Sequence, residues 1–263
     1  MYESFAHLYD EFMQTIPADE WADYIEQLFE KHQLRPHLVL DLACGTGSLA
    51  LELNRRGYDM IGVDGSEEML QQAGEKAENT GKSEESLFLL QDMREFELYG
   101  TVDAIVCTCD SLNYLLEEED IRQVFALAEN YLDQGGLFLF DMNTEYKYRQ
   151  ILGEQTFADT TEDGAFIWDN YFYEDEKINE YQVTFFEEME NGLYRRSEET
   201  HYQKAYQAED IKKWLEEAHL KVEGIYDSFT LNQPDEKSER ITFVAREIRE
   251  KQRYIEEGEE ENE

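Results

Sequence analysis

The sequence has little of what would mark a secreted, disulfide-bonded or membrane-spanning protein. Its 3 cysteines among 263 residues are too few for a disulfide framework, so we expect a reducing, cytoplasmic setting. No apolar run approaches the roughly 18–20 residues that a membrane helix needs. The opening MYESFAHLYDEFMQ lacks the basic start of a secretory signal. We also find no internal repeat and no zinc-type spacing of cysteine and histidine.

Positively charged residues are also few. Lys and Arg number 23 against 62 Asp and Glu, which gives a formal net charge of -39. Such a charge repels the phosphates of nucleic acids and anionic membrane surfaces, so we expect neither as a partner. The acidity indicates either a solvated surface or acids gathered at a cleft for a cationic substrate. Residues 249–263 are expected to form an acidic tail without chemistry.

Apolar runs alternate with amphipathic segments between residues 37 and 150. This alternation is typical of a parallel sheet that helices cover on both faces. In such sheets a ligand binds beyond the carboxyl ends of the strands, at the topological switch point. We expect strands at 37–43, 59–66, 87–93, 102–110 and 135–143, and helices at 17–30, 47–57, 67–81 and 117–133.

The pattern changes after about residue 150. Residues 166–206 form aromatic, extended runs with rough period-two alternation, and Asn191-Gly192 predicts a hairpin turn between two of them. A helix is expected at 208–220, and strands at 221–229 and 239–247 have no helix between them, which favours an antiparallel pair. The predicted fold is therefore doubly wound α/β, with a mostly parallel seven-stranded sheet and an inserted antiparallel β subdomain.

These patterns divide the chain into four parts. We expect an N-terminal helical cap over residues 1–36 and an α/β domain built from 37–150 and 207–248. The inserted β subdomain would take residues 151–206, and the acidic tail 249–263.

A glycine-rich turn, DLACGTG at residues 41–47, joins the first predicted strand to a helix. Gly45 and Gly47 let the backbone approach a ligand closely, and the helix start offers unpaired N–H groups to an anion. Asp41 is expected to order this loop by accepting backbone N–H bonds. The loop continues to Ala50, so it also matches a dinucleotide fingerprint, and a nicotinamide-dependent oxidoreductase stays a second interpretation.

Acids follow the next three strands. Asp64 can accept hydrogen bonds from two ribose hydroxyls, because an ionised carboxylate only accepts. Asp92 can accept from an adenine amine, beside an apolar contact from Met93. Asp110, in CDSLNY at 109–114, would face the reacting part of a ligand. The alternative for each acid is an ordinary turn or helix-cap role.

DLACGTG, VDGS, QDM and CDSLNY, in this order at strand ends, resemble the motifs of class I S-adenosylmethionine-dependent methyltransferases. The opening M-Y-x-x-F-A-x-x-Y-D pattern is similar to that of small bacterial proteins assigned to the methyltransferases, and the chain also resembles sugar N,N-dimethyltransferases. The resemblance spans nearly the whole chain and implies S-adenosylmethionine as cofactor. The cofactor-binding residues that it implies are Tyr9, Ala43, Gly45, Asp64, Gly65, Asp92, Met93 and Asp110.

Each of these residues has an implied part. The backbone around Ala43 and Gly45 would hold the amino acid end of the cofactor, and Asp110 would lie near its methionine portion. Tyr9 would close over the cofactor, unless it is simply a core aromatic.

The expected reaction is in-line methyl transfer to nitrogen or oxygen of a small-molecule acceptor, with no metal. No general base is evident, and the candidates are His7, Asp110, Tyr114, Asn143 and His201. A binding protein without turnover is therefore a third interpretation. The aromatic inserted strands could cover the acceptor, pair with a second copy in a homodimer, or only pack against the parent domain.

Overall fold

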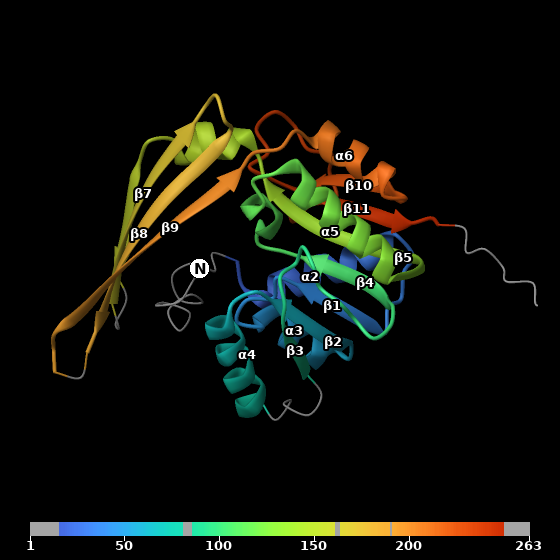
Figure 1. Ribbon diagram of the computed structural model, residues 1–263, viewed down its shortest axis with the longest axis horizontal. Coiled ribbons are helices and arrows are strands. Elements are labelled where there is room, and N and C mark those ends of the chain that lie inside the picture. Colours follow the sequence, from blue (N-terminus) through green and yellow to red (C-terminus); the bar gives the residue numbers. More distant parts are fainter. Residues whose placement is uncertain (1–15, 81–85, 161–163, 190, 250–263) are drawn as a thin grey trace, which may run out of the picture.

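The computed structural model describes residues 16–80, 86–160, 164–189 and 191–249. Within these residues a seven-stranded sheet has the order β10-β11-β5-β4-β1-β2-β3 (Figure 1). β11 is antiparallel to both of its neighbours, and the other pairs are parallel. The strands are β1 Leu38–Leu42, β2 Asp59–Asp64, β3 Ser86–Leu90, β4 Val102–Cys107, β5 Leu132–Asn143, β10 Leu220–Asp227 and β11 Arg240–Glu247.

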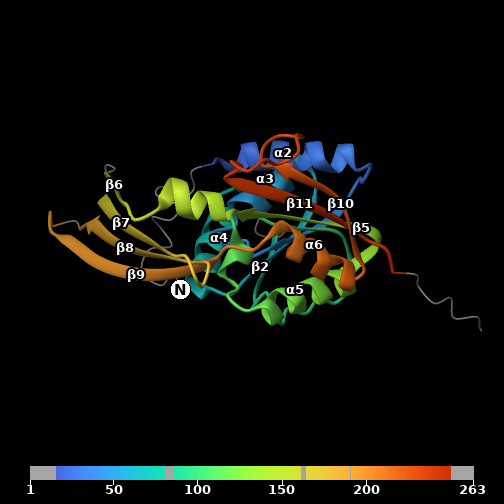
Figure 2. The same ribbon diagram turned by 90° about the horizontal axis from the view of Figure 1, so that it is seen from above.

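Helices cover both faces of this sheet, so its strands are buried on both sides. α2 (Ala18–Lys31) and α3 (Ser48–Arg56) pack on one face, and α5 (Glu118–Tyr131) and α6 (Ala208–Glu217) on the other. Figure 2 shows α2 and α5 on opposite sides of the strands. Successive residues of β1 alternate between the two cores: Val39 joins the α2–α3 side, and Leu40 joins the α5–α6 side. α4 (Glu67–Thr80) follows β2. The predicted doubly wound α/β fold is confirmed.

The three strands that precede the acidic motifs end earlier than predicted. β2 ends at Asp64, β3 at Leu90 and β4 at Cys107. Cys109 and Asp110 have φ values of 59° and 52°, which no strand accommodates. Asp92 and Asp110 therefore lie in the loops after β3 and β4, and Asp64 is the last residue of β2.

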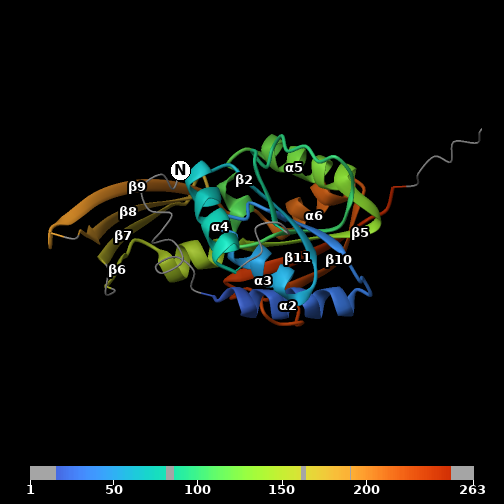
Figure 3. The same ribbon diagram turned by 90° about the horizontal axis from the view of Figure 1, so that it is seen from below.

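The predicted inserted β subdomain is a four-stranded antiparallel sheet in the order β6-β7-β8-β9. Its strands are β6 Thr156–Thr160, β7 Gly164–Tyr173, β8 Ile178–Glu188 and β9 Tyr194–Lys204, and η2 (Lys147–Leu152) leads into it from β5. Asn191 and Gly192 lie in the β8–β9 turn, where Gly192 N donates to Met189 O at 2.8 Å. Figure 3 shows these strands extending away from the α/β domain.

The inserted sheet is tied to the ends of β4 and β5 by backbone-directed hydrogen bonds. Asn113, in the turn η1 (Ser111–Tyr114) after β4, donates from Nδ2 to Lys204 O of β9 at 2.8 Å. Its Oδ1 accepts from Asn143 N at the end of β5 at 3.0 Å. Among the described helices, none is both long and apolar enough to cross a membrane.

Candidate functional site

A cavity of about 810 Å³ opens at the carboxyl ends of β1, β2, β3 and β4. Its volume lies in the usual range for small-molecule and cofactor sites. Of the residues predicted to bind the cofactor, the cavity brings together Ala43, Gly45, Asp64, Gly65, Asp92 and Met93. Tyr9 lies outside the described residues, and Asp110 is not among the lining residues.

The glycine loop gives its two left-handed glycines different tasks. A Cβ added at Gly47 would lie 2.8 Å from Ala73 Cβ of α4 and 2.9 Å from the Phe88 ring, whereas one added at Gly45 would meet nothing within 4 Å. Gly45 lines the cavity, so its backbone is open to a ligand. Gly47 permits close packing of the loop on α4 and β3, so the predicted ligand approach applies to Gly45 and not to Gly47.

Asp64 holds the glycine loop in place. Its Oδ2 accepts from Gly45 N at 2.8 Å and its Oδ1 from Ser66 N at 2.8 Å. Burial raises the pKa of Asp64, and these backbone N–H groups partly offset that rise. A carboxylate oxygen can accept more than one hydrogen bond, so each oxygen keeps capacity for a ligand hydroxyl at the cavity wall.

Asp41 accepts a backbone hydrogen bond from Ala50, in the first turn of α3 directly after the glycine loop. Its side chain is 1% exposed, and among the described residues its Oδ2 has no hydrogen-bond partner. Burial, followed by the charge of Asp64, raises the pKa of Asp41 to about 7. The loop is ordered by Asp64 from the neighbouring strand, because that carboxylate reaches the Gly45 N–H group.

The opposite wall of the cavity combines one acid with apolar side chains. Asp92 binds Arg94 through two contacts, at 2.9 Å to Nε and 2.6 Å to Nη2. This ion pair holds the pKa of Asp92 below its usual value, so the side chain stays an acceptor. Met93 and Leu115 supply apolar surface beside it, which suits the flat face and exocyclic amine of a base.

The carboxylate of Asp110 has other partners. Oδ1 accepts from Arg240 Nη2 at 2.6 Å, and Oδ2 accepts from Gln203 Nε2 at 2.6 Å. Arg240 also pairs with Asp141 at the end of β5. The flanking Cys109 and Ser111 line the cavity instead. Asp110 thus joins β4, β9 and β11, a contact that the local sequence pattern could not indicate.

The candidate bases do not converge on one reacting point. The Tyr114 hydroxyl is hydrogen-bonded to that of Tyr181, and Tyr114 lines the cavity. Asn143 is buried and accepts from Lys147 Nζ at 2.9 Å. His201 is buried in the inserted sheet, stacked on Tyr181. His7 lies outside the described residues, and within them no group of three or more His, Cys, Asp or Glu could hold a metal ion.

Sequence reasoning missed several residues near the cavity. Leu90 and Leu115 are lining residues without a distinctive motif, and Ile16 and Trp21 from the segment before β1 line a narrow adjoining cleft. Only the apolar periodicity of α2 indicated that Trp21 points inward. Its place beside the glycine loop depends on packing between elements.

Comparisons with known proteins agree on one family. Residues 39–136 match the family model described as a methyltransferase domain. A Geobacillus protein assigned to the methyltransferases is 38% identical over 246 residues, which cover 93% of this chain and 99% of that protein. The structure of an S-adenosylmethionine-dependent methyltransferase from Clostridium acetobutylicum has a TM-score of 0.84 at 31% identity, covering 94% and 99% of the two chains.

A third likeness includes the inserted strands. The structure of a sugar N-methyltransferase from Streptoalloteichus has a TM-score of 0.75 at 19% identity, and the match covers 92% of each chain. At that identity the likeness concerns the fold alone.

Proposed function

Because this chain belongs to the class I S-adenosylmethionine-dependent methyltransferases, we propose that it methylates a nitrogen or oxygen of a small molecule. The observation that carries this proposal is the further space that adjoins the cofactor cavity. A cleft shares Ala43, Gly45, Cys109 and Ser111 with that cavity. Through Ile16 the cleft adjoins a further cavity of about 500 Å³, a size that suits a metabolite.

The residues of the large cavity fit S-adenosylmethionine. Asp64 would accept from the ribose hydroxyls, Asp92 would accept from the adenine amine with Met93 against the ring, and the backbone at Ala43 and Gly45 would hold the amino acid end. When bound, the cofactor supplies a methyl group on a sulfonium, ready for in-line displacement by a nucleophile.

The contribution of this chain is then positioning and exclusion of water. No described side chain is arranged as an evident general base, and in-line transfer to a well-oriented nucleophile needs little covalent help. An amine acceptor must lose its proton before it attacks. The rate should therefore increase as the pH rises through the pKa of the acceptor's amine.

The test combines binding and turnover. Calorimetric titration should give micromolar affinity for S-adenosylmethionine and none for NADH. Formation of S-adenosylhomocysteine is then measured with a panel of small amines and alcohols, and with a basic protein and RNA as controls. Methylation of the protein or the RNA in place of every small molecule would refute the proposal.

A binding protein without turnover is the second candidate function, favoured by the absence of an evident base in the described part of the chain. It predicts tight cofactor binding with no methyl transfer across the whole panel. The nicotinamide interpretation is wrong, since the Clostridium acetobutylicum methyltransferase that matches 94% of this chain depends on S-adenosylmethionine.

We also propose a homodimer through the outer face of the inserted sheet. Tyr171 of β7 and Tyr202 of β9 are both register partners of Glu180 on β8, so the three side chains lie on one face. Both tyrosines are exposed, and so is Ile167. Sedimentation equilibrium of a Tyr171→Glu, Tyr202→Glu variant should give a monomer where the wild type gives a dimer. A wild-type monomer would refute this assembly.

The predicted domain boundaries and the cytoplasmic location stay proposals. Limited proteolysis should cut near 151 and 207 if residues 151–206 form a separate unit. Cell fractionation should recover the protein in the cytoplasmic fraction, and binding to nucleic acid should be absent because of the net charge of -39.

A further inference from the structure

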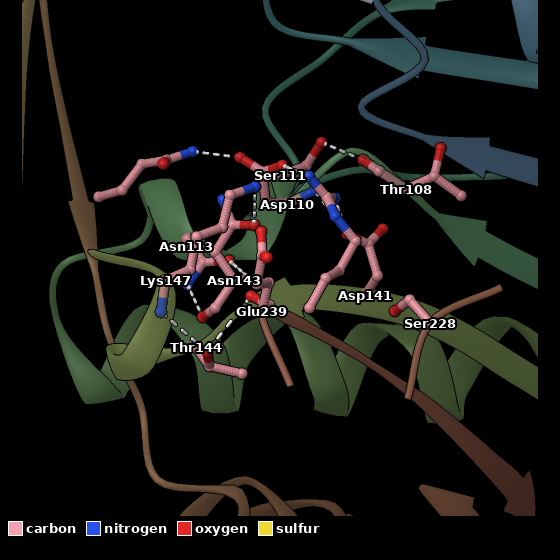
Figure 4. Close-up of polar contacts among 12 residues, drawn as sticks. Thr108, Asp110, Ser111, Asn113, Asp141, Asn143, Thr144, Lys147, Ser228 and Glu239 are labelled. Carbon is pink, nitrogen blue, oxygen red and sulfur yellow. Dashed lines mark hydrogen bonds and ion pairs between the residues drawn. The ribbon is translucent and has the colours of Figure 1, made fainter. Parts of the chain in front are cut away.

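The cavity of about 500 Å³ beyond Ile16 is lined by a lysine in an unusual environment. It lies where β5 leads into η2 and where β10 and β11 are joined, and Lys147, Ser228 and Arg240 are among its lining residues. Lys147 is partly buried, and its Nζ donates to Asn143 Oδ1 at 2.9 Å (Figure 4). Among the described residues this amide is the only side-chain acceptor of Nζ, and none of their carboxylates lies within ion-pair distance of it.

The nearest acids are occupied elsewhere. Arg240 pairs with both Asp110 and Asp141, so these carboxylates and Glu239 act on Lys147 only at longer range, where their charges partly offset the fall in its pKa. Burial, and next the positive charge of Arg240, lower the pKa of Lys147. A partly buried ammonium group without a direct ion pair among the described residues is costly. An anion in the cavity would relieve this cost and could accept from the two N–H groups that Asn143 leaves free.

Acids also line this cavity, and they limit what the anion can be. Asp227, Asp235 and Glu239 are lining residues together with the exposed Lys237. Asp235 and Glu239 are exposed, so water screens them at the rim. They would repel a polyanion and attract an ammonium group. This mixture suits a compact molecule that carries an amine and one anionic group.

We propose that the methyl acceptor binds in this cavity and that Lys147 holds its anionic group, a carboxylate or a phosphate. This inference rests on the proposed function. The acceptor's nucleophile would then point past Ile16 toward Cys109 and Ser111, which line the cofactor side. Lys147 is a specificity-determining residue in this arrangement, and Arg240 keeps Asp110 and Asp141 from neutralising it.

The first experiment tests the anion site without a known acceptor. Thermal unfolding is followed in acetate, inorganic phosphate and chloride at equal ionic strength, with S-adenosylhomocysteine at saturation. Because a ligand that binds only the folded state raises its Tm, we expect acetate or phosphate to add about 2–4 °C over chloride. Lys147→Met should lose this increment, Lys147→Arg should keep most of it, and Lys213→Met, a control on the exposed face of α6, should behave as wild type.

The outcomes separate the two anion sources and the two proposals. An increment with acetate alone indicates a carboxylate, and one with phosphate alone indicates a phosphate. An equal increment in wild type and Lys147→Met, or none in either, would overturn the inference. Near-ultraviolet circular dichroism checks that Lys147→Met is folded, and a folded Lys147→Arg that loses the increment would also count against charge recognition.

Turnover supplies the second readout. Acceptors are compared in matched pairs that differ in the anion, glycine with glycinamide and glucosamine 6-phosphate with glucosamine. The anionic member should have at least a tenfold higher kcat/KM, through KM, and Lys147→Met should abolish that ratio. A preference for the neutral member would overturn the inference. If S-adenosylmethionine binds but no acceptor is methylated, the proposed function fails, and the anion titration alone decides the Lys147 site.

Discussion

Replacing each of the two loop glycines by alanine should separate packing from ligand binding. Both have positive φ, 53° at Gly45 and 71° at Gly47, so either alanine costs about 1–2 kcal/mol of backbone strain. At Gly47 the added Cβ would also lie 2.8 Å from Ala73 Cβ and 2.9 Å from Phe88. Such overpacking costs roughly 1–3 kcal/mol more, so Gly47→Ala should lower the free energy of unfolding by about 2–5 kcal/mol.

Gly45→Ala is the matched control, because its Cβ would meet no atom of the protein within 4 Å. Its loss of stability should stay at about 1–2 kcal/mol. Its Cβ would project where the loop faces the cavity, so the affinity for S-adenosylmethionine should fall at least about tenfold, or about 1.4 kcal/mol.

Urea unfolding, followed by tryptophan fluorescence, measures the first effect, and calorimetric titration measures the second. Gly47→Ala, at temperatures where it is folded, should bind the cofactor within a few-fold of wild type. Equal destabilisation by the two substitutions, or a larger loss of affinity at Gly47, would refute the division of tasks.

Three further perturbations test the site and its support. Asp64→Ala and Asp92→Ala should each weaken S-adenosylmethionine binding by about 1–3 kcal/mol in calorimetry, and wild-type affinity in both folded variants would contradict the site. Since the folded-state pKa of Asp41 is raised to about 7 from 3.8, the native state binds the extra proton, and stability from this group is lost as pH rises from about 4 to 7. In urea unfolding, the free energy of unfolding of Asp41→Asn should therefore increase relative to that of wild type between pH 5 and pH 8. A difference that does not change with pH would disprove the raised pKa of Asp41. Arg240→Met leaves Asp110 and the buried Asp141 without their cation and should lower the free energy of unfolding by about 3–5 kcal/mol in the same assay. Adding Asp110→Asn and Asp141→Asn to Arg240→Met should restore part of this loss, and no recovery would show that the three charges are not coupled.

Local patterns predicted the elements because their causes are local. Strand and helix order followed from apolar periodicity, and the Asn191–Gly192 turn from the backbone preferences of those two residues. The positions of Asp64 and Asp92 followed from the same pattern, since a polar residue after a buried strand must lie at the sheet's carboxyl edge. Ala43, Gly45 and Gly65 lie on the same edge for that reason.

Long-range contacts explain where the sequence argument was incomplete. Asp110 looked like its neighbours in the motif, but Arg240, which is 130 residues later in the chain, holds its carboxylate. The N–H group of Gly45 is bound by Asp64 because β2 lies beside β1 and brings its acid to the loop. Gly47 serves packing because α4 folds back over the loop.

The sequence by itself determined the class of fold, the order of its elements and the edge of the sheet where the large cavity opens, since hydrophobic periodicity and turn chemistry act between near neighbours in the chain. Only the tertiary structure decided which acids face the cavity, that Arg240 takes both Asp110 and Asp141, and that Lys147 lines a separate cavity without a direct ion pair in the described part of the chain. Those features depend on side chains far apart in sequence and on the burial that folding imposes, which no local pattern encodes.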